Sequence, residues 1–116
     1  MWGTGSASRE FLFVDDAAEG VVLGAERYDG REPINLGANH EVPIKDLVEL
    51  VVAAVGFDGE IRWDTSKPDG QPRRRVDASR AEELLGFSPH TRFEDGLRET
   101  VDWYLGHREE AERRLS

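Results

Sequence analysis

Charged and turn-forming residues are concentrated in one stretch near the middle of the chain, SKPDGQPRRRVD, which spans residues 66–77. The Pro-Asp-Gly sequence at residues 68–70 predicts a tight turn that would project Lys67 and Arg73 from nearby points. A guanidinium fork presents paired donors to two oxygens, which suits a diphosphate. Asp77 could then accept a hydrogen bond from a sugar hydroxyl or a base amine. The stretch therefore predicts one wall of a nucleotide-sugar site.

A second interpretation of the same stretch is an ordinary solvated segment. In a chain with 24 acidic residues, three arginines commonly pair with nearby carboxylates, and each exposed pair contributes roughly 0 to 1 kcal/mol. Asp77 could equally be a charge that favours the start of a helix at Ser79. Trp2 and Arg9, taken alone, are typical of a packing residue and an exposed charge. Both interpretations stay open on the residues alone.

The composition limits the classes of function. The chain has 116 residues, enough for one domain, and a formal net charge of −9, which disfavours nucleic acid and anionic membranes as partners. There is no cysteine, so disulfides and thiolate chemistry are excluded. His40, His90 and His107 lack the spacing of metal ligands. Without a signal-peptide pattern or a spanning apolar run, we expect a cytoplasmic protein.

Hydrophobic periodicity predicts a mixture of short strands and amphipathic helices. In the first helix, the apolar residues Ala18, Val21, Val22 and Ala25 keep helical spacing. The segment between Gly37 and the second helix is predicted to be a loop. The predicted strands lie at residues 10–14, 34–36 and 61–63, and the predicted helices at residues 17–27, at residues 44–55, in two turns from Ser79, and after Thr91.

Helix starts and ends carry their own signals. Capping boxes are predicted at three helix starts, and Gly56 and Gly86 stand where left-handed caps belong. Gly20 and Gly24 lower the helix propensity of the first helix by up to about 1 kcal/mol each, which predicts close packing against them. The three boxes are Asp16 with Glu19, Ser79 with Glu82, and Thr91 with Glu94.

The element order predicts a small mixed α/β domain. Nothing supplies the run of several strand–helix units that a parallel sheet needs. The stretch GTGSAS near the start is not a glycine-rich phosphate loop, because no strand precedes it and a strand rather than a helix follows.

An ordered set of motifs resembles a known family over nearly the whole chain: WGTG, REFLFVDDAAEG, INLGANHEVPIKDLVELV, VGFDGEIRWDTSKPDGQPRRRVDASRAEELLGFSP and FEDGLRETVDWYL. It is similar to the C-terminal, substrate-binding part of GDP-L-fucose synthase, an NADP-dependent epimerase-reductase of the extended short-chain dehydrogenase class. The resemblance implies that residues 1–116 form one nucleotide-sugar-binding domain without the N-terminal Rossmann sheet.

The resemblance also implies site residues. In the family, the residues matching Trp2, Arg9 and Asp77 contact the GDP-sugar. By their chemistry, Trp2 offers a flat face for stacking, Arg9 a fork for phosphate, and Asp77 an acceptor for a hydroxyl or amine. Lys67 and Arg73 are added here from charge and turn geometry alone. Arg75 departs from the family, which usually has an apolar residue at this position.

The family's cofactor loop and catalytic residues have no counterpart in the chain, so the resemblance implies no catalytic residue, no metal and no cofactor here, with NADP expected only for the full-length family. The segments EFLFVDDAAEG and PINLG would normally pack against the missing portion, so their apolar faces are predicted to be exposed and to drive self-association.

Three functions remain open: half of an epimerase-reductase completed by a separate Rossmann-type chain, a non-catalytic nucleotide-sugar-binding module, and an oligomeric assembly protein that has lost the pocket.

Overall fold

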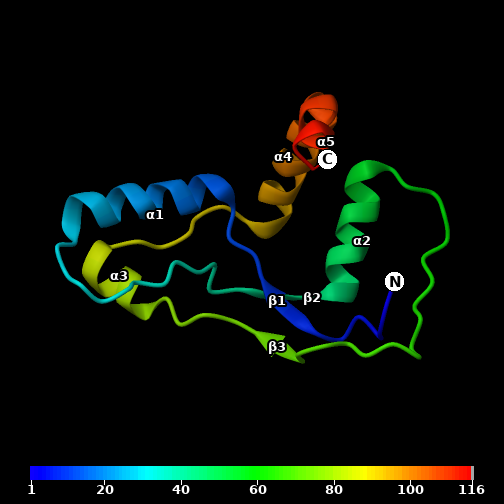
Figure 1. The fold of residues 1–116 in the computed structure, drawn as a ribbon, viewed down its shortest axis with the longest axis horizontal. Helices are drawn as coiled ribbons and strands as arrows, with labels where there is room; N and C mark the ends of the chain where they lie inside the picture. Colours follow the sequence, from blue (N-terminus) through cyan, green and yellow to red (C-terminus); the bar gives the residue numbers. More distant parts are fainter. Residues whose placement is uncertain (116) are drawn as a thin grey trace.

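A three-stranded sheet lies at the centre of the molecule, with helices toward both ends (Figure 1). The structure, a computed structural model, describes residues 1–115. The helices α1 and α3 pack together at one end, and α2 packs against α4 at the other. In chain order the elements are β1 (Ser8–Glu10), α1 (Val14–Arg27), β2 (Glu41–Pro43), α2 (Ile44–Val55), β3 (Arg73–Arg74), α3 (Ser79–Leu85), α4 (Phe93–Gly106) and α5 (Arg108–Leu115).

The sheet has the order β2-β1-β3, so the first strand is central. It pairs with β2 in antiparallel register, with Glu10 opposite Glu41, and with β3 in parallel register, with Arg9 opposite Arg74. Because side chains alternate between the faces of a strand, these registers decide which charges share a face. The small mixed α/β fold that the sequence predicts is therefore confirmed.

The buried core lies between α1, α3 and the segment that connects α1 to β2. Ala81, Leu85 and Phe87 are almost fully buried. Gly20 lets this cluster approach α1, because a Cβ at residue 20 would stand 2.8 Å from Leu36 and 3.2 Å from Phe87. The partly buried side chains around the cluster are Leu12, Leu23, Tyr28, Ile34 and Leu36.

Three predicted strands differ from the structure. The strand expected at residues 10–14 lies at Ser8–Glu10, where it has partners on both sides, and α1 begins at Val14. Residues 34–36 form no strand because they have no ladder partner within the described residues 1–115. Residues 61–63 likewise form no strand, and the pairing nearby is one parallel bridge between Trp2 and Asp64. Neither β2 nor β3 was expected, because each is too short to show periodicity.

The second and third helices agree with prediction. The second covers residues 44–55 as expected, and α3 begins at Ser79. Gly56 and Gly86 end these helices with φ of 66°, a backbone conformation that glycine tolerates without strain. The sequence signals for helix ends were therefore reliable.

The predicted capping boxes are wrong. The N-cap residues of α1, α3 and α4 make no side-chain cap hydrogen bond. Asp16 lies inside α1 and is buried, where its carboxylate accepts hydrogen bonds from the N–H and hydroxyl of Thr91. Asp16 and Thr91 therefore bond to each other, across 75 residues of sequence, instead of capping the start of a helix.

The apolar positions that keep helical spacing in α1 are all exposed: Ala18, Val21, Val22 and Ala25. The helix instead turns Asp16 and Gly20 inward. Gly20 is closely packed as predicted, whereas Gly24 has open space where a Cβ would stand. Within the described residues, no helix is both long and apolar enough to cross a lipid bilayer.

Candidate functional site

The N-terminal residues run alongside residues 62–74, which brings together four of the five predicted site residues (Figure 1). The Asp64 N–H donates to Met1 O (2.7 Å), the Gly3 N–H to Asp64 O (3.0 Å) and the Ser8 N–H to Pro72 O (2.9 Å). This pairing brings four predicted site residues onto two adjacent segments. Trp2 and Arg9 lie on the first segment, and Lys67 and Arg73 lie on the second, about 60 residues later in the sequence.

Trp2 and Lys67 form a pair near the N-terminal end of the first segment. The Lys67 ammonium lies 5.8 Å from the centre of the Trp2 ring, within the range of a cation–π interaction. Trp2 is 74% exposed, so a large part of the indole is free to stack on a planar group. The pair thus offers a cation and a flat apolar face to one ligand.

The loop that carries Lys67 is anchored by Asp69. Its carboxylate accepts hydrogen bonds from the Thr4 N–H (2.5 Å) and the Thr4 hydroxyl (2.7 Å). The hydroxyl bond and then the backbone bond hold the pKa of Asp69 below its ordinary value. Gly3 makes room for this contact, because a Cβ there would stand 2.4 Å from an Asp69 oxygen. The carboxylate is therefore an anchor, which the sequence did not indicate.

The predicted turn at residues 68–70 is displaced. The structure places the turn at Asp64–Lys67, where the Lys67 N–H donates to Asp64 O at 3.1 Å. Asp64 stabilises it, because one carboxylate oxygen accepts from the Ser66 N–H and hydroxyl. Gly70 keeps a positive φ of 77°, so the segment after the turn still depends on glycine.

One face of the sheet holds an ion network. Arg73 donates to both oxygens of Glu41, with its Nε at 2.8 and 2.9 Å and its Nη2 at 2.5 Å. This bond with Arg73, with a further hydrogen bond from Ser8, lowers the pKa of Glu41 to about 2. Arg75 lies 4.0 Å from Glu41 and 4.0 Å from the buried carboxylate of Glu10. On this face, the carboxylates and the arginines largely neutralise one another.

The opposite face of the sheet holds two arginines side by side. Arg9 and Arg74 are register partners in the parallel pairing, so their side chains leave the same face. Both line a hollow of about 210 Å³, which Glu10 and Arg75 also line. Arg9 donates to the carbonyls of Ser8 (2.6 Å) and Gln71 (2.9 Å), not to a carboxylate. No ion pair of Arg74 occurs among the described residues. Two guanidinium groups there are available to an anion.

Arg74 is a candidate that the sequence analysis missed. Three consecutive arginines look equivalent in a sequence, and only the strand register separates Arg74 from Arg73. The sequence did carry one signal: side chains alternate between the two faces of a strand, so the middle arginine faces away from its two neighbours.

Asp77, the fifth predicted residue, is engaged at the start of α3. Its Oδ1 accepts a hydrogen bond from the Ser79 N–H at 2.9 Å, and this bond lowers the pKa of Asp77. Arg73, Arg75, Val76 and Asp77 line a second open hollow. Asp77 therefore has the helix-start role that the sequence offered as its alternative, with its carboxylate still at the edge of a hollow.

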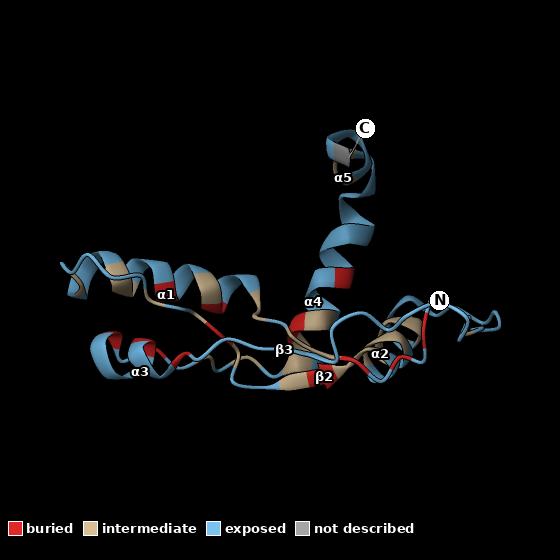
Figure 2. Ribbon diagram, turned by 60° about the horizontal axis from the view of Figure 1, so that its bottom comes forward, coloured by how far each residue is buried: buried red, intermediate tan, exposed pale blue. Residues whose placement is uncertain are grey.

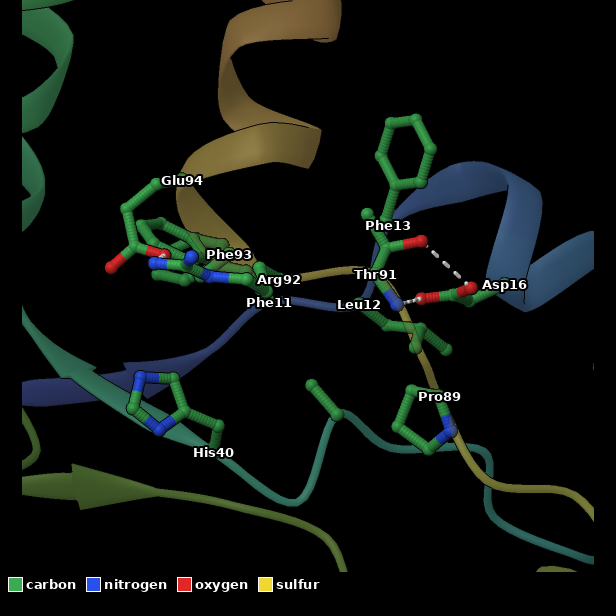
Figure 3. Close-up of a pocket in the computed structure, with 11 residues that line it drawn as sticks. Phe11, Leu12, Phe13, Asp16, His40, Pro89, Thr91, Arg92, Phe93 and Glu94 are labelled. Atoms are coloured by element: carbon green, nitrogen blue, oxygen red, sulfur yellow. Dashed lines mark hydrogen bonds and ion pairs between the residues drawn. The ribbon is translucent and has the colours of Figure 1, made fainter.

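A further pocket of about 370 Å³ contains none of the predicted site residues (Figure 3). Among its lining residues, Phe11 and Phe93 have rings 5.9 Å apart, and Asp16 and Thr91 are joined by hydrogen bonds. The residues that line the pocket are Phe11, Leu12, Phe13, Asp16, Ala38, His40, Pro89, Thr91, Arg92, Phe93 and Glu94.

Asp16 also belongs to the group of possible metal ligands found among residues 1–115, with Glu19 and His90, whose ligand atoms all lie within 4.8 Å of one another. Both oxygens of Asp16 already accept hydrogen bonds from Thr91. We therefore assign no metal site to this group.

Comparisons with known proteins support the resemblance. A family model described as the NAD dependent epimerase/dehydratase family matches residues 1–37. GDP-L-fucose synthase 1 of Arabidopsis thaliana is 50% identical over 105 residues, which are 90% of this chain and 32% of that protein.

Solved structures agree. A GDP-L-fucose synthetase from Naegleria fowleri bound to NADP matches with a TM-score of 0.86 and 32% identity, over 94% of this chain and 35% of that one. A UDP-glucose 4-epimerase from Thermotoga maritima, solved with UDP-glucose, matches with a TM-score of 0.79 and 27% identity, over 91% and 34%.

The chain thus spans about a third of the length of the proteins it matches. The similarity to part of GDP-L-fucose synthase that the motifs indicate is confirmed. The fold is that of part of an extended short-chain dehydrogenase.

Proposed function

We propose that this chain binds the diphosphate of a nucleotide sugar, as the substrate-binding portion of a GDP-L-fucose synthase-like epimerase-reductase. The observation that carries the proposal is the register of β1 and β3, which sets Arg9 beside Arg74 without a carboxylate partner for either. Two guanidinium forks on one face supply the paired donors and the positive charge that suit a diphosphate.

The remaining site residues take supporting roles in this proposal. Trp2 stacks on the base or the sugar, and Lys67, above the ring, adds a positive charge at that end. Asp77 accepts from a ligand hydroxyl through the oxygen that does not bind Ser79. Arg73 is the weakest of the predicted ligand-binding residues, because its Nε and Nη2 already donate to Glu41.

The proposed ligand is a GDP-sugar, because relatives of 50% and 32% identity are GDP-L-fucose synthases by name. A titration calorimeter with GDP-mannose tests this directly, and we expect a dissociation constant between about 1 μM and 1 mM. A parallel titration with UDP-glucose tests whether binding depends on the base. A titration with mannose alone tests whether binding requires the diphosphate. Equal binding of mannose and GDP-mannose would overturn the proposal.

We expect no oxidoreductase activity from this chain by itself, because its sequence carries no glycine-rich cofactor loop and no Tyr-x-x-x-Lys pair. NADPH oxidation by the purified chain with a keto-deoxy GDP-sugar would contradict that expectation. NADP chemistry belongs, in this proposal, to a separate protein chain or part.

A second candidate function is an assembly protein that has lost the pocket. The ion pair of Arg73 with Glu41 and the hydrogen bond of Asp77 with Ser79 favour it, because both residues have structural partners. This candidate predicts a chain that is indifferent to GDP-mannose at millimolar concentration.

A further inference from the structure

The chain that follows the N-terminus is buried at every second residue. Gly3, Gly5 and Ala7 are buried, whereas the residues between them are exposed. Figure 2 shows buried stretches along this part of the chain, which we call the N-terminal segment (residues 1–7). The two glycines have positive φ angles of 78° and 74°, a conformation that other residues adopt only with strain. The path of the N-terminal segment therefore depends on glycine at two positions.

The start of α2 holds the N-terminal segment in place. The Ile44 N–H donates to Ala7 O and the Lys45 N–H donates to Gly5 O, both at 2.9 Å. The first amides of a helix have no partner inside the helix, and Pro43, at the N-cap position of α2, supplies no side-chain cap bond. Carbonyls of the N-terminal segment thus take the place of the cap, and α2 fixes the position of this segment.

Two side chains of the connection from α2 to β3 attach it to the N-terminal segment. Trp63 packs directly on Gly5, because a Cβ at residue 5 would stand 2.6 Å from the Trp63 ring. Asp69 accepts hydrogen bonds from the N–H and the hydroxyl of Thr4. Lys67 lies between these two residues in the sequence. The backbone that carries Lys67 is therefore held on both sides.

Trp2 and Lys67 depend on these attachments for their relative position. The Lys67 ammonium lies over the Trp2 ring, and no hydrogen bond fixes either side chain within residues 1–115. Both residues are exposed, so packing does not hold their side chains either. The geometry of the pair is consequently set by the two backbones, which Asp69 and Trp63 hold together.

We propose that Asp69 determines the preference of the site for a ligand that carries a planar base, as a positioning residue that acts through Trp2 and Lys67. In the proposed function, Arg9 and Arg74 bind the diphosphate, and a base can stack on Trp2. Loss of the Thr4–Asp69 contact should therefore weaken binding of the base and spare binding of the diphosphate. The ligand preference rests on the proposed function, whereas the position of Lys67 over Trp2 is measured without a ligand.

The first measurement is the NMR chemical shift of the Lys67 ε-methylene protons, which the ring current of Trp2 moves upfield when the two side chains lie together. Trp2→Ala gives the shift without the ring. Asp69→Ala and Thr4→Val should each move the shift most of the way to that value, and Thr4→Ser, which keeps the hydroxyl, should not. Asp58→Ala is the matched control, because Asp58 lies in the same connection and has no hydrogen bond or ion pair among residues 1–115.

The variants should keep the fold. The core cluster of Ala81, Leu85 and Phe87 lies beside α1 and α3, at the other end of the molecule from the N-terminus and from the connection after α2 (Figure 1). A circular dichroism spectrum and a thermal midpoint check the fold of each variant before the other measurements.

The second measurement compares GDP with inorganic pyrophosphate, which carries the diphosphate without the base. In calorimetric titrations, the unmodified chain should bind GDP about tenfold or more tightly than pyrophosphate, because a base gains affinity by stacking on an aromatic side chain. Asp69→Ala should remove most of this preference and leave the affinity for pyrophosphate within a few-fold of the unmodified chain. Thr4→Ser and Asp58→Ala should keep the preference.

Each outcome bears on a different claim. An unchanged Lys67 shift in Asp69→Ala would overturn the positioning role, and with it the inference. Equal losses of GDP and pyrophosphate affinity in Asp69→Ala would also overturn it, because a residue that only holds the fold together gives that result. Binding of GDP and pyrophosphate with equal affinity by the unmodified chain would overturn the base preference and leave the diphosphate site standing. Binding of neither ligand would overturn the proposed function and the base preference together.

Discussion

Arg9 and Arg74 are direct partners in the parallel pairing of β1 and β3, so both guanidinium groups leave the same face of the sheet. The residues on either side of them leave the other face, where Arg73 binds Glu41 and Arg75 lies between Glu10 and Glu41. The three consecutive arginines therefore do two different things. The outer two lie against the carboxylates of Glu10 and Glu41, and the middle one has no ion pair among residues 1–115.

The Glu41–Arg73 pair should make stability depend on acid. Its hydrogen bond with Arg73 lowers the pKa of Glu41 from 4.5 to about 2 in the folded chain. A depressed folded pKa contributes stability above the unfolded pKa, and this is lost as pH falls from about 4.5 toward 2. An NMR titration of the Glu41 carboxyl carbon should show a midpoint at about 2. A midpoint at 4.5 would contradict the ion pair.

Two glycines on α1 should respond oppositely to alanine. In Gly20→Ala the new methyl would stand 2.8 Å from Leu36, which should cost about 1–3 kcal/mol of unfolding free energy by overpacking. Gly24→Ala meets open space and should gain up to about 1 kcal/mol from helix propensity. Urea unfolding of the two variants measures both effects. Equal effects would show that α1 does not pack as described.

Asp77 is expected to stabilise α3 whether or not it contacts a ligand. Asp77→Ala removes the acceptor of the Ser79 N–H and should lower the thermal midpoint, while Asp77→Asn keeps an acceptor oxygen and should largely restore it. Because the hydrogen bond with Ser79 lowers the pKa of Asp77, this stabilisation should fade as the pH falls through that depressed pKa. An unchanged midpoint in Asp77→Ala would remove the helix-start role.

Trp2 should contribute to binding through its exposed ring. Trp2→Ala should weaken GDP-mannose binding by about 1–3 kcal/mol, the range for stacking of a base on an aromatic side chain, and Trp2→Phe should retain most of the affinity. Trp103, which is 51% exposed on α4, provides the control, since Trp103→Ala removes an exposed indole away from the site. If Trp2→Ala and Trp103→Ala bind GDP-mannose with the same affinity, Trp2 does not contact the ligand.

The helices could largely be predicted from the sequence, and the sheet could not. Ile44–Val55 and Ser79–Leu85 follow from local signals, namely an apolar period and a following glycine with a left-handed conformation. Ser8–Glu10 and Arg73–Arg74 are too short for any period, and they become strands only because residues distant in sequence pair with them. A local sequence pattern does not reveal that pairing.

The site shows the same division. Residue chemistry and family resemblance selected Trp2, Arg9 and Lys67, which the structure brings onto two adjacent segments. They also selected Arg73 over Arg74, because nothing in the sequence locates Glu41, the carboxylate that occupies Arg73. On α1, likewise, periodicity finds an apolar face but does not say whether the chain itself covers it.

The most direct test of the account is the difference between the two faces of the sheet in binding GDP-mannose. Calorimetric titrations of Arg9→Ala and Arg74→Ala should each show affinity reduced by about tenfold or more, as for the loss of a charge-assisted hydrogen bond. Arg73→Ala/Glu41→Gln, which removes the ion pair from the other face, should bind within a few-fold of the unmodified chain, as should Arg31→Ala in an exposed loop. The opposite pattern, with binding lost in the Arg73 and Glu41 variant and retained in Arg74→Ala, would contradict the assignment of the diphosphate to Arg9 and Arg74.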